Sequence, residues 1–259
     1  MLCSQVEGYL SRSSWIRRMF EAGIELKKKY GPENVYDFSL GNPDLAPPAA
    51  VAQGLRELAD EAGKPFAFGY MPNAGYPQVR ARLAEVISGE QGTAVTADEV
   101  VVTCGAAGGI NALFRAVLEP GDEVLCPAPY FVEYGFYAEN HRGVLKAVPS
   151  KPLTFELDIK ALAAAITERT RCVLVNSPNN PTGRIYTLDE LASLADVLRQ
   201  ASARTGRPIL LISDEPYRFL AYDGADVPAI FPVYEHSVVV SSFSKNLALA
   251  GERVGYVAV

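Results

Sequence analysis

The sequence predicts an α/β fold: a mostly parallel, seven-stranded sheet with helices on both faces, in three α/β/α layers. Two observations support this prediction. From residue 99 onward, short runs rich in Val, Ile and Leu alternate with helical patterns. The runs are apolar at consecutive positions, as in strands that are buried on both faces. Strands of this kind, joined by helices, form a parallel sheet covered on both sides.

Each expected element follows from its own pattern. The seven strands are expected at 99–104, 123–127, 143–149, 171–178, 208–215, 237–244 and 253–259. Helices are expected at 15–30, 51–63, 77–89, 111–121, 130–140, 157–166 and 187–204. Thr187 provides a hydroxyl N-cap for the last of these helices, and Pro120 with Gly121 ends the helix at 111–121. Residues 1–40 are expected to be an N-terminal helix and arm, and residues 41–259 one large domain.

Composition narrows the classes of function. The chain has 259 residues, of which 49% are hydrophobic and 21% charged, so it can bury a sizeable core. Its net charge is −6 with no basic stripe, which argues against a nucleic-acid partner. No apolar run reaches the roughly 18 residues that a membrane span needs. The N-terminus lacks a signal-peptide pattern, so we expect a cytoplasmic protein.

The cysteines and histidines give no sign of metal binding. Cys104, Cys126 and Cys172 lie in or beside apolar runs and are expected to be small buried hydrophobic side chains. His141 and His236 are far apart in the sequence and lack ligand-like spacing. We therefore expect no metal site.

The predicted sheet directs attention to its strand ends. Open α/β sheets bind ligands beyond the carboxyl ends of their strands. Polar or glycine-rich clusters follow five of the expected strands, at 103–109, 127–134, 176–183, 213–217 and 241–245. These clusters are the candidates for a common site.

Lys245 is the candidate nucleophile. It follows an apolar strand, has Ser242 and Ser244 beside it, and precedes Arg253. Hydroxyls and a guanidinium are good phosphate ligands, because they combine hydrogen-bond donors with positive charge. A lysine held among such groups can be neutral enough to attack a carbonyl. A solvated loop lysine is the alternative for any lysine seen alone.

Asp214 and Tyr217 lie at another strand end. A carboxylate directly after apolar strand residues is costly unless it is paired. Asp214 can therefore face a cationic heterocycle, although a helix N-cap or a loop acid fits the same pattern. Tyr217, three residues later, can bring a phenol to the same ligand.

Two further clusters complete the set. In 175–183, VNSPNNPTG, the residues favour a turn, and Asn180 can donate an amide hydrogen bond to a ligand oxygen. In 102–110, VTCGAAGGI, small residues let an anion approach backbone N–H groups at a helix start. Neither a dinucleotide-binding nor a P-loop glycine pattern is present. Together the clusters suit a ligand with an aldehyde, a phosphate, a ring nitrogen and a phenolic oxygen, which describes pyridoxal phosphate.

The order of these motifs resembles the class I/II aminotransferases, which are pyridoxal-phosphate enzymes of fold type I. The motifs are SLGNPD at 39–44, Tyr70 with Gly75, CGAAGG, PAPYFVEY, SPNNPTG, SDEPY and SFSKNLALAGERVGY. The resemblance extends from about residue 35 to residue 259. It implies the large domain of that fold, an α/β/α sandwich.

The resemblance implies a role for each matched residue. Lys245 would form the internal aldimine, Asp214 would pair with the pyridine nitrogen, and Asn180 with Tyr217 would bind the 3′ oxygen. The phosphate would be bound by Gly105, Ala106, Ala107, Ser242, Ser244 and Arg253. Phe131 would stack on the ring, with the adjacent Tyr130 or simple core packing as alternatives. Tyr70 would reach the phosphate of a neighbouring subunit in a homodimer. Gly41, and Asn180 again, would contact the substrate.

The activity implied is transfer of an amino group from an amino acid to a 2-oxo acid by a ping-pong mechanism, with Lys245, Asp214 and Tyr217 as catalytic residues. The family's smaller C-terminal domain, which supplies an arginine for the substrate carboxylate, is expected to be absent from this chain. The alternatives are a lyase or synthase on the same scaffold, and a cofactor-binding domain without turnover. A sensor domain of a transcription regulator is disfavoured, because residues 1–35 are too short for a DNA-binding domain.

Overall fold

The computed structural model describes residues 1–2, 6–9, 14–38 and 41–259. The chain divides into two compact units, Met1–Asp44 and Leu45–Val259. The first unit contains helix α2 (Ser14–Tyr30) and the short 3-10 helix η1 (Pro32–Asn34). Lys27 and Asp37 form an ion pair there at 2.8 Å.

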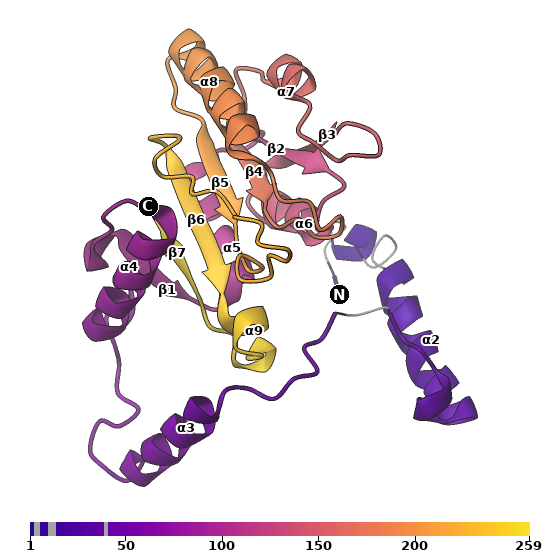
Figure 1. Cartoon of the computed structure of the whole chain (residues 1–259), viewed down its shortest axis with the longest axis vertical. Helices are drawn as coiled ribbons and strands as arrows, with labels where there is room; N and C mark the ends of the chain where they lie inside the picture. Colours follow the sequence, from indigo (N-terminus) through magenta and orange to yellow (C-terminus); the bar gives the residue numbers. More distant parts are fainter. Residues whose placement is uncertain (3–5, 10–13, 39–40) are drawn as a thin grey trace. The chain divides into compact units, whose positions relative to one another are not determined.

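The second unit is built on a seven-stranded sheet with the order β1-β7-β6-β5-β4-β2-β3 (Figure 1). β7 runs antiparallel to both of its neighbours, and every other pair is parallel. This confirms the predicted mostly parallel sheet. The strands are β1 (Val100–Thr103), β2 (Glu123–Ala128), β3 (Val144–Pro149), β4 (Thr170–Asn176), β5 (Leu210–Asp214), β6 (Ser237–Ser242) and β7 (Gly255–Ala258).

Two apolar cores lie on opposite faces of the sheet, because successive strand side chains point to opposite sides. In β4, Val173 and Val175 join one core, whereas Cys172 and Leu174 join the other. The first core is covered by α4 (Pro77–Gln91), α7 (Ile159–Ala165) and α8 (Leu188–Thr205). The second core is covered by α5 (Gly105–Val117) and α6 (Glu133–Asn140) (Figure 1). The three-layer prediction is thereby confirmed.

Several expected boundaries were wrong, and two of the errors concern the site. α5 begins at Gly105, before the expected 111, because its glycines allow close packing and do not interrupt the helix. A Cβ on Gly109 would lie 2.9 Å from the Val257 side chain. β6 ends at Ser242, and Phe243–Asn246 form the short helix α9, so Lys245 lies on a helical turn. The expected helix at 130–140 begins at Glu133.

Helix α3 (Ala49–Glu61) and the short 3-10 helices contribute no residue to either core. Helix α3 has no buried residue, and α8 starts with the expected Thr187 cap, whose hydroxyl accepts from the Glu190 N–H. The short 3-10 helices η2 (Ala97–Glu99) and η3 (Ala250–Glu252) precede β1 and β7. In the part of the chain that the structure describes, no helix has the length and apolarity to cross a membrane.

The cysteine prediction holds for Cys126 and Cys172, which are buried, and is wrong for Cys104, which is exposed. Cys104 is the residue immediately before α5, in the turn that joins β1 to α5. An apolar neighbourhood in sequence therefore did not translate into burial at this position.

Gly255 holds the start of α5 against the sheet. A Cβ at this position would lie 2.6 Å from the Gly105 carbonyl carbon and 2.6 Å from the Ser241 carbonyl oxygen. Real Cβ atoms do not approach backbone so closely. The glycine therefore allows α5, β6 and β7 to meet at one point.

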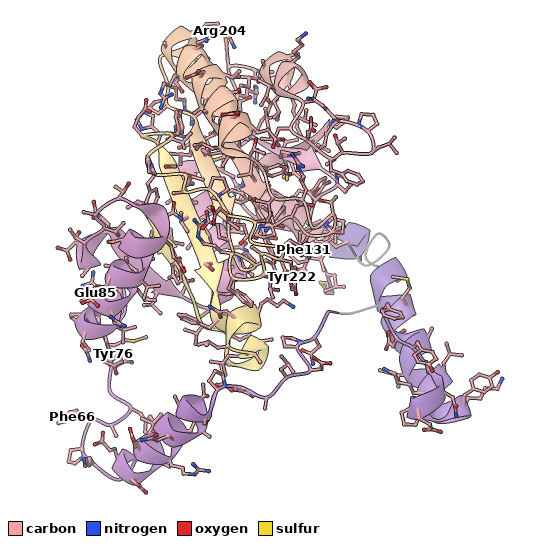
Figure 2. The ribbon with its side chains drawn as sticks, in the orientation of Figure 1. Phe66, Tyr76, Glu85, Phe131, Arg204 and Tyr222 are labelled. Carbon is pink, nitrogen blue, oxygen red and sulfur yellow. The ribbon has the colours of Figure 1, made fainter. Side chains whose placement is uncertain are left out.

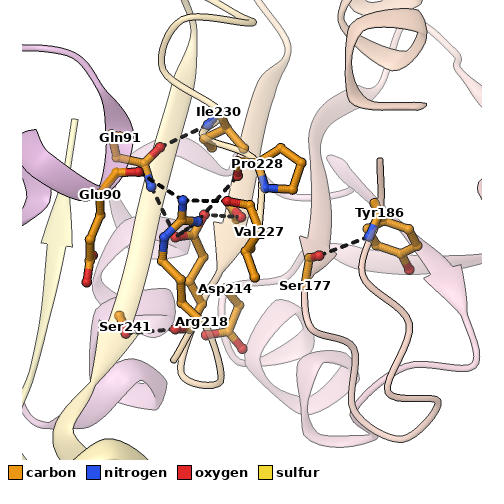
Figure 3. A network of polar contacts seen from close by, with 12 residues as sticks. Glu90, Gln91, Ser177, Tyr186, Asp214, Arg218, Val227, Pro228, Ile230 and Ser241 are labelled. Atoms are coloured by element: carbon orange, nitrogen blue, oxygen red, sulfur yellow. Dashed lines mark hydrogen bonds and ion pairs between the residues drawn. The ribbon is translucent and has the colours of Figure 1, made fainter. Parts of the chain in front are cut away.

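A buried polar network lies beside the end of β5 (Figure 3). Glu215 forms an ion pair with Arg218 at 3.0 Å and accepts from Ser213 Oγ at 2.7 Å and Gln91 Nε2 at 3.1 Å. Arg218 also donates to the carbonyl oxygens of Glu90, Val227 and Pro228. The network joins the end of α4 and the 226–230 loop to the residue that follows Asp214.

We expect Gly255→Ala to destabilise the protein by about 1–3 kcal/mol, because the added methyl group overlaps backbone that cannot move freely. Urea denaturation measures the loss. Gly89→Ala is the matched control, because Gly89 lies within α4 with open space around the added Cβ. Alanine is the better helix former, so the control should be neutral or stabilised. Equal stability of the two variants would contradict the packing argument.

We expect Arg218→Ala to cost roughly 3–5 kcal/mol, because it leaves the buried Glu215 carboxylate without its cation. Arg199→Ala is the control, since Arg199 pairs with the exposed Asp196 and Glu235. Exposed ion pairs contribute only about 0–1 kcal/mol. Chemical denaturation of both variants at neutral pH tests the difference, and similar losses would refute a special role for the buried network.

Candidate active site

The carboxyl ends of the strands open onto a pocket of about 230 Å³. Residues from all five polar clusters line this pocket, so the structure brings these clusters together. The lining consists of Ala106, Ala107, Ile110, Phe131, Glu133, Tyr134, Tyr137, Asn176, Asn180, Asp214, Pro216, Tyr217, Ser242, Ser244, Lys245, Ala250 and Arg253.

Asp214 is the buried acid of the pocket. It ends β5, a central strand, and its Oδ2 accepts a hydrogen bond from the Tyr134 hydroxyl. Its Oδ1 is buried and has no hydrogen-bond partner. Burial raises the pKa of Asp214 to about 7, although the Tyr134 hydrogen bond opposes the shift. A buried carboxylate oxygen that lines a pocket without a partner is suited to a cationic N–H donor.

Two asparagines support this strand end. Asn176, which ends the neighbouring β4, donates from Nδ2 to the Asp214 carbonyl oxygen at 2.8 Å. Its Oδ1 accepts from the Asn180 N–H at 2.6 Å, which fixes the turn after β4. Burial raises the pKa of Tyr217, and a hydrogen bond with the Asn180 side chain opposes the shift. The Asn180 amide and the Tyr217 phenol are therefore neighbours, as the sequence implied.

The start of α5 and Arg253 form the electropositive end of the pocket. No side chain caps the first turn of α5, so its N–H groups can serve an anion. A Cβ on Gly105 would lie 3.1 Å from Arg253 Nη2, so the glycine lets the guanidinium approach the helix start. Arg253 Nη1 donates to the Ala250 carbonyl oxygen at 2.9 Å. Ser242 and Ser244 line the same pocket.

Lys245 projects from the short helix α9 and lines the pocket. Its side chain is partly buried, and burial lowers the pKa of its amine. A lowered pKa increases the fraction of neutral, nucleophilic amine at physiological pH. The pocket thus combines an amine with a lowered pKa, a buried carboxyl group and an uncapped helix start beside a guanidinium.

Phe131, which is labelled in Figure 2, places an aromatic ring in the pocket lining. Its ring meets the Tyr134 ring edge-on, with centroids 5.5 Å apart and an interplanar angle of 81°. Tyr130, the alternative considered for this position, packs against the second core and is absent from the pocket lining.

Three predicted residues are not part of the pocket lining. Gly105 lies next to Ala106 and contacts the guanidinium region of Arg253. Tyr70 is fully exposed on the segment between α3 and α4, and Figure 2 labels Phe66 and Tyr76 on the same segment. Gly41 belongs to the first compact unit. The roles assigned to Tyr70 and Gly41 stay predictions.

Sequence reasoning gave no role to four polar residues that line the pocket: Glu133, Tyr134, Tyr137 and Asn176. The Tyr137 hydroxyl donates to Glu133 Oε2 at 2.7 Å. Tyr134 lay within the flagged 127–134 cluster, and Asn176 opened the 176–183 cluster. The sequence patterns therefore included Tyr134 and Asn176 in the candidate clusters, but they did not indicate where these side chains point.

Comparison with known proteins agrees with the fold and the motifs. The family model for aminotransferase class I and II matches residues 33–259. A probable aspartate/prephenate aminotransferase of Thermus aquaticus is 37% identical over 90% of this chain and 58% of its own length. An aspartate aminotransferase of Pyrococcus horikoshii is 31% identical over 96% of this chain and 60% of its length. The chain thus spans about three fifths of these curated relatives.

Solved structures give the same result. The crystal structure of an amino transferase from Eubacterium rectale superposes with a TM-score of 0.93 at 39% identity, covering 100% of this chain and 66% of that one. The aspartate aminotransferase of Thermus thermophilus with maleate gives a TM-score of 0.82 at 32% identity, covering 94% of this chain and 61% of that one. By its family match, its sequence identity and its fold, the chain belongs to the class I and II aminotransferases.

Proposed function

We propose that this chain forms the cofactor-binding part of a pyridoxal-phosphate-dependent aminotransferase that moves an amino group from an amino acid to a 2-oxo acid. The observation that carries the proposal is the unpartnered, buried Oδ1 of Asp214 in the pocket that Lys245 also lines. The relatives described above are named as aminotransferases, which favours transamination over a lyase or synthase reaction.

The residues present fit pyridoxal phosphate. Asp214 Oδ1 offers an acceptor for a protonated ring nitrogen, and Asn180 with Tyr217 offers donors for the ring oxygen. The open first turn of α5, Ser242, Ser244 and Arg253 suit the phosphate, and Phe131 suits the ring face. Each polar group of the cofactor thereby finds a matching group in the pocket.

When bound, pyridoxal phosphate supplies an aldehyde for the substrate amine and a ring that accepts the electron pair of the substrate α-carbon. Lys245 Nζ would hold the aldehyde of the cofactor in the resting state. Once released, this amine would take the proton from the substrate α-carbon as a base and, as an acid, pass it to the cofactor carbon that carried the aldehyde. Asp214 would hold a proton on the ring nitrogen, which would strengthen the ring as an electron acceptor. The amino acid would leave as its 2-oxo acid before the second 2-oxo acid binds, so we expect ping-pong kinetics.

Three further features belong to this proposal. Aspartate is the first amino donor to test, because the relatives from Thermus and Pyrococcus are named for it. A homodimer would let Tyr70, exposed on one subunit, serve the pocket of the other, as the family resemblance implies. Gly41 and Asn180 would contact the substrate, and a cytoplasmic location is expected.

We expect Lys245→Ala to lose the visible absorbance of the covalently bound cofactor and all amino transfer from aspartate, because no other lysine is among the described residues that line the pocket. Absorbance spectra after incubation with pyridoxal phosphate measure binding separately from turnover. The matched control is Lys160→Ala, an exposed lysine of α7, which should behave as the parent chain. A wild-type chain that shows the band without turnover would support the binding domain alone. A Lys245→Ala variant that retains both would refute the assignment.

The cofactor-free chain should lose stability as the pH rises from about 4 to about 7. Burial raises the pKa of both Asp214 and Glu215 to about 7 in the folded state, above the usual carboxyl value. The folded state therefore holds protons that the unfolded state has released, and each such group costs up to about 1.4 kcal/mol per pH unit in that range. Urea denaturation at pH 5 and pH 7 measures the loss.

Asp214→Asn provides the control for this pH dependence, because the amide does not titrate. We expect this variant to retain only the part of the slope that Glu215 contributes. Equal slopes in the parent chain and in Asp214→Asn would show that Asp214 ionises at its ordinary pKa. Bound pyridoxal phosphate should also reduce the slope, since a cationic ring nitrogen stabilises the ionised carboxylate.

A further inference from the structure

Tyr134 is a buried polar residue with no assigned role in the proposed chemistry. It lies in the first turn of α6, and only 1% of it is exposed. Its hydroxyl donates a hydrogen bond to Asp214 Oδ2 across the second core. A phenol placed in an apolar core needs a partner, and here the partner is the acid of the pocket.

The two oxygens of Asp214 consequently differ. Oδ2 is occupied by the phenol, whereas Oδ1 is buried without a partner and belongs to a pocket-lining residue. A carboxylate held at one oxygen cannot rotate freely about its last torsion, so the direction of the other oxygen is fixed as well. A hydrogen bond to the ionised form also favours ionisation, which opposes the effect of burial.

We propose that Tyr134 is the positioning residue of Asp214: its hydroxyl orients the carboxylate, favours its ionised form and presents Oδ1 to the cationic nitrogen of a heterocyclic ligand. The identity of that ligand rests on the proposed function. The state of Asp214 in the cofactor-free chain does not, so the two claims can be tested apart.

The other titratable groups around Asp214 do not replace the phenol. Cys126 on β2, Tyr137 on α6 and Tyr217 after β5 interact with it electrostatically. Burial raises the pKa of each of these three groups, so they are neutral at physiological pH. Lys245 on α9 and Arg253 before β7 are basic residues that line the same pocket. The hydrogen bond from Tyr134 is thus the specific contact to the carboxylate.

Tyr134→Phe tests the proposal, because it removes the hydroxyl and keeps the ring. The pKa of Asp214 is measured by NMR titration of carboxyl-¹³C-labelled aspartate in the full, cofactor-free chain, with the signal identified by its loss in Asp214→Asn. We expect the variant to raise this pKa by about one pH unit or more. Cofactor affinity should fall roughly tenfold in absorbance titrations with pyridoxal phosphate, since one unit of pKa is a factor of ten.

Tyr234→Phe is the matched control. Tyr234 is also 1% exposed, and its hydroxyl donates to the Ile209 carbonyl oxygen at 2.7 Å, but it belongs to the first core, on the other face of the sheet. This variant loses a buried hydrogen bond of the same kind, so it reveals any general effect of destabilisation. We expect the pKa of Asp214 and the cofactor affinity to match those of the parent chain.

A substitution that keeps the fold covers the case in which Tyr134→Phe does not fold. Replacement of Tyr134 by 3-fluorotyrosine makes the phenol a stronger donor at almost the same volume, and it should lower the pKa of Asp214. An unchanged pKa in either variant would overturn the proposal. Absence of cofactor binding by the parent chain would count against the proposed function, while the titration of Asp214 would still decide the role of Tyr134.

Discussion

The buried carboxylate of Asp214 is the constraint on which the site depends. A buried, ionised carboxylate is costly unless its oxygens are matched by hydrogen-bond donors or a cation. The fold provides one match, the Tyr134 hydroxyl, and leaves Oδ1 directed at no protein group. Asn176 fixes the backbone behind it through the Asp214 carbonyl oxygen. One carboxylate oxygen of Asp214 is thus held by a hydrogen bond, and the other lacks a partner. A bound cationic ring would supply that partner.

Glu215, the next residue, has hydrogen-bond donors at both of its carboxylate oxygens. It is as deeply buried as Asp214, yet its two oxygens accept from Ser213, Gln91 and Arg218. Ser241 Oγ also donates to its carbonyl oxygen, which joins the ends of β5 and β6. The two consecutive acids therefore differ in their contacts. Glu215 links α4 and the 226–230 loop to the sheet through Gln91 and Arg218, whereas Asp214 lines the pocket. The distinction rests on partners, because burial alone does not separate them.

The sequence was sufficient for the sheet and for the residues at its strand ends, since both follow from local patterns and one topological rule. Asp214, Asn180, Tyr217 and Lys245 were found in this way, and the pocket is lined by all four. Tyr134 was not singled out, because the direction of a side chain after a turn depends on packing that no spacing records. The start of α5 was missed for a related reason: its glycines resemble a turn until Val257 is known to lie against Gly109.

Close packing at Gly255 and Gly105, together with the register of the sheet, determines where the residues that line the pocket lie. Asp214 pairs with Val240 across β5 and β6, and Lys245 follows five residues later on α9. Because β5 and β6 are adjacent strands and α9 directly follows β6, the acid and the amine line the same pocket. Gly255 in β7 lets the start of α5 lie against β6, and Gly105 lets the Arg253 guanidinium approach the start of α5. The positions of Arg253, the start of α5 and Asp214 around the pocket thus depend on backbone packing and on strand register.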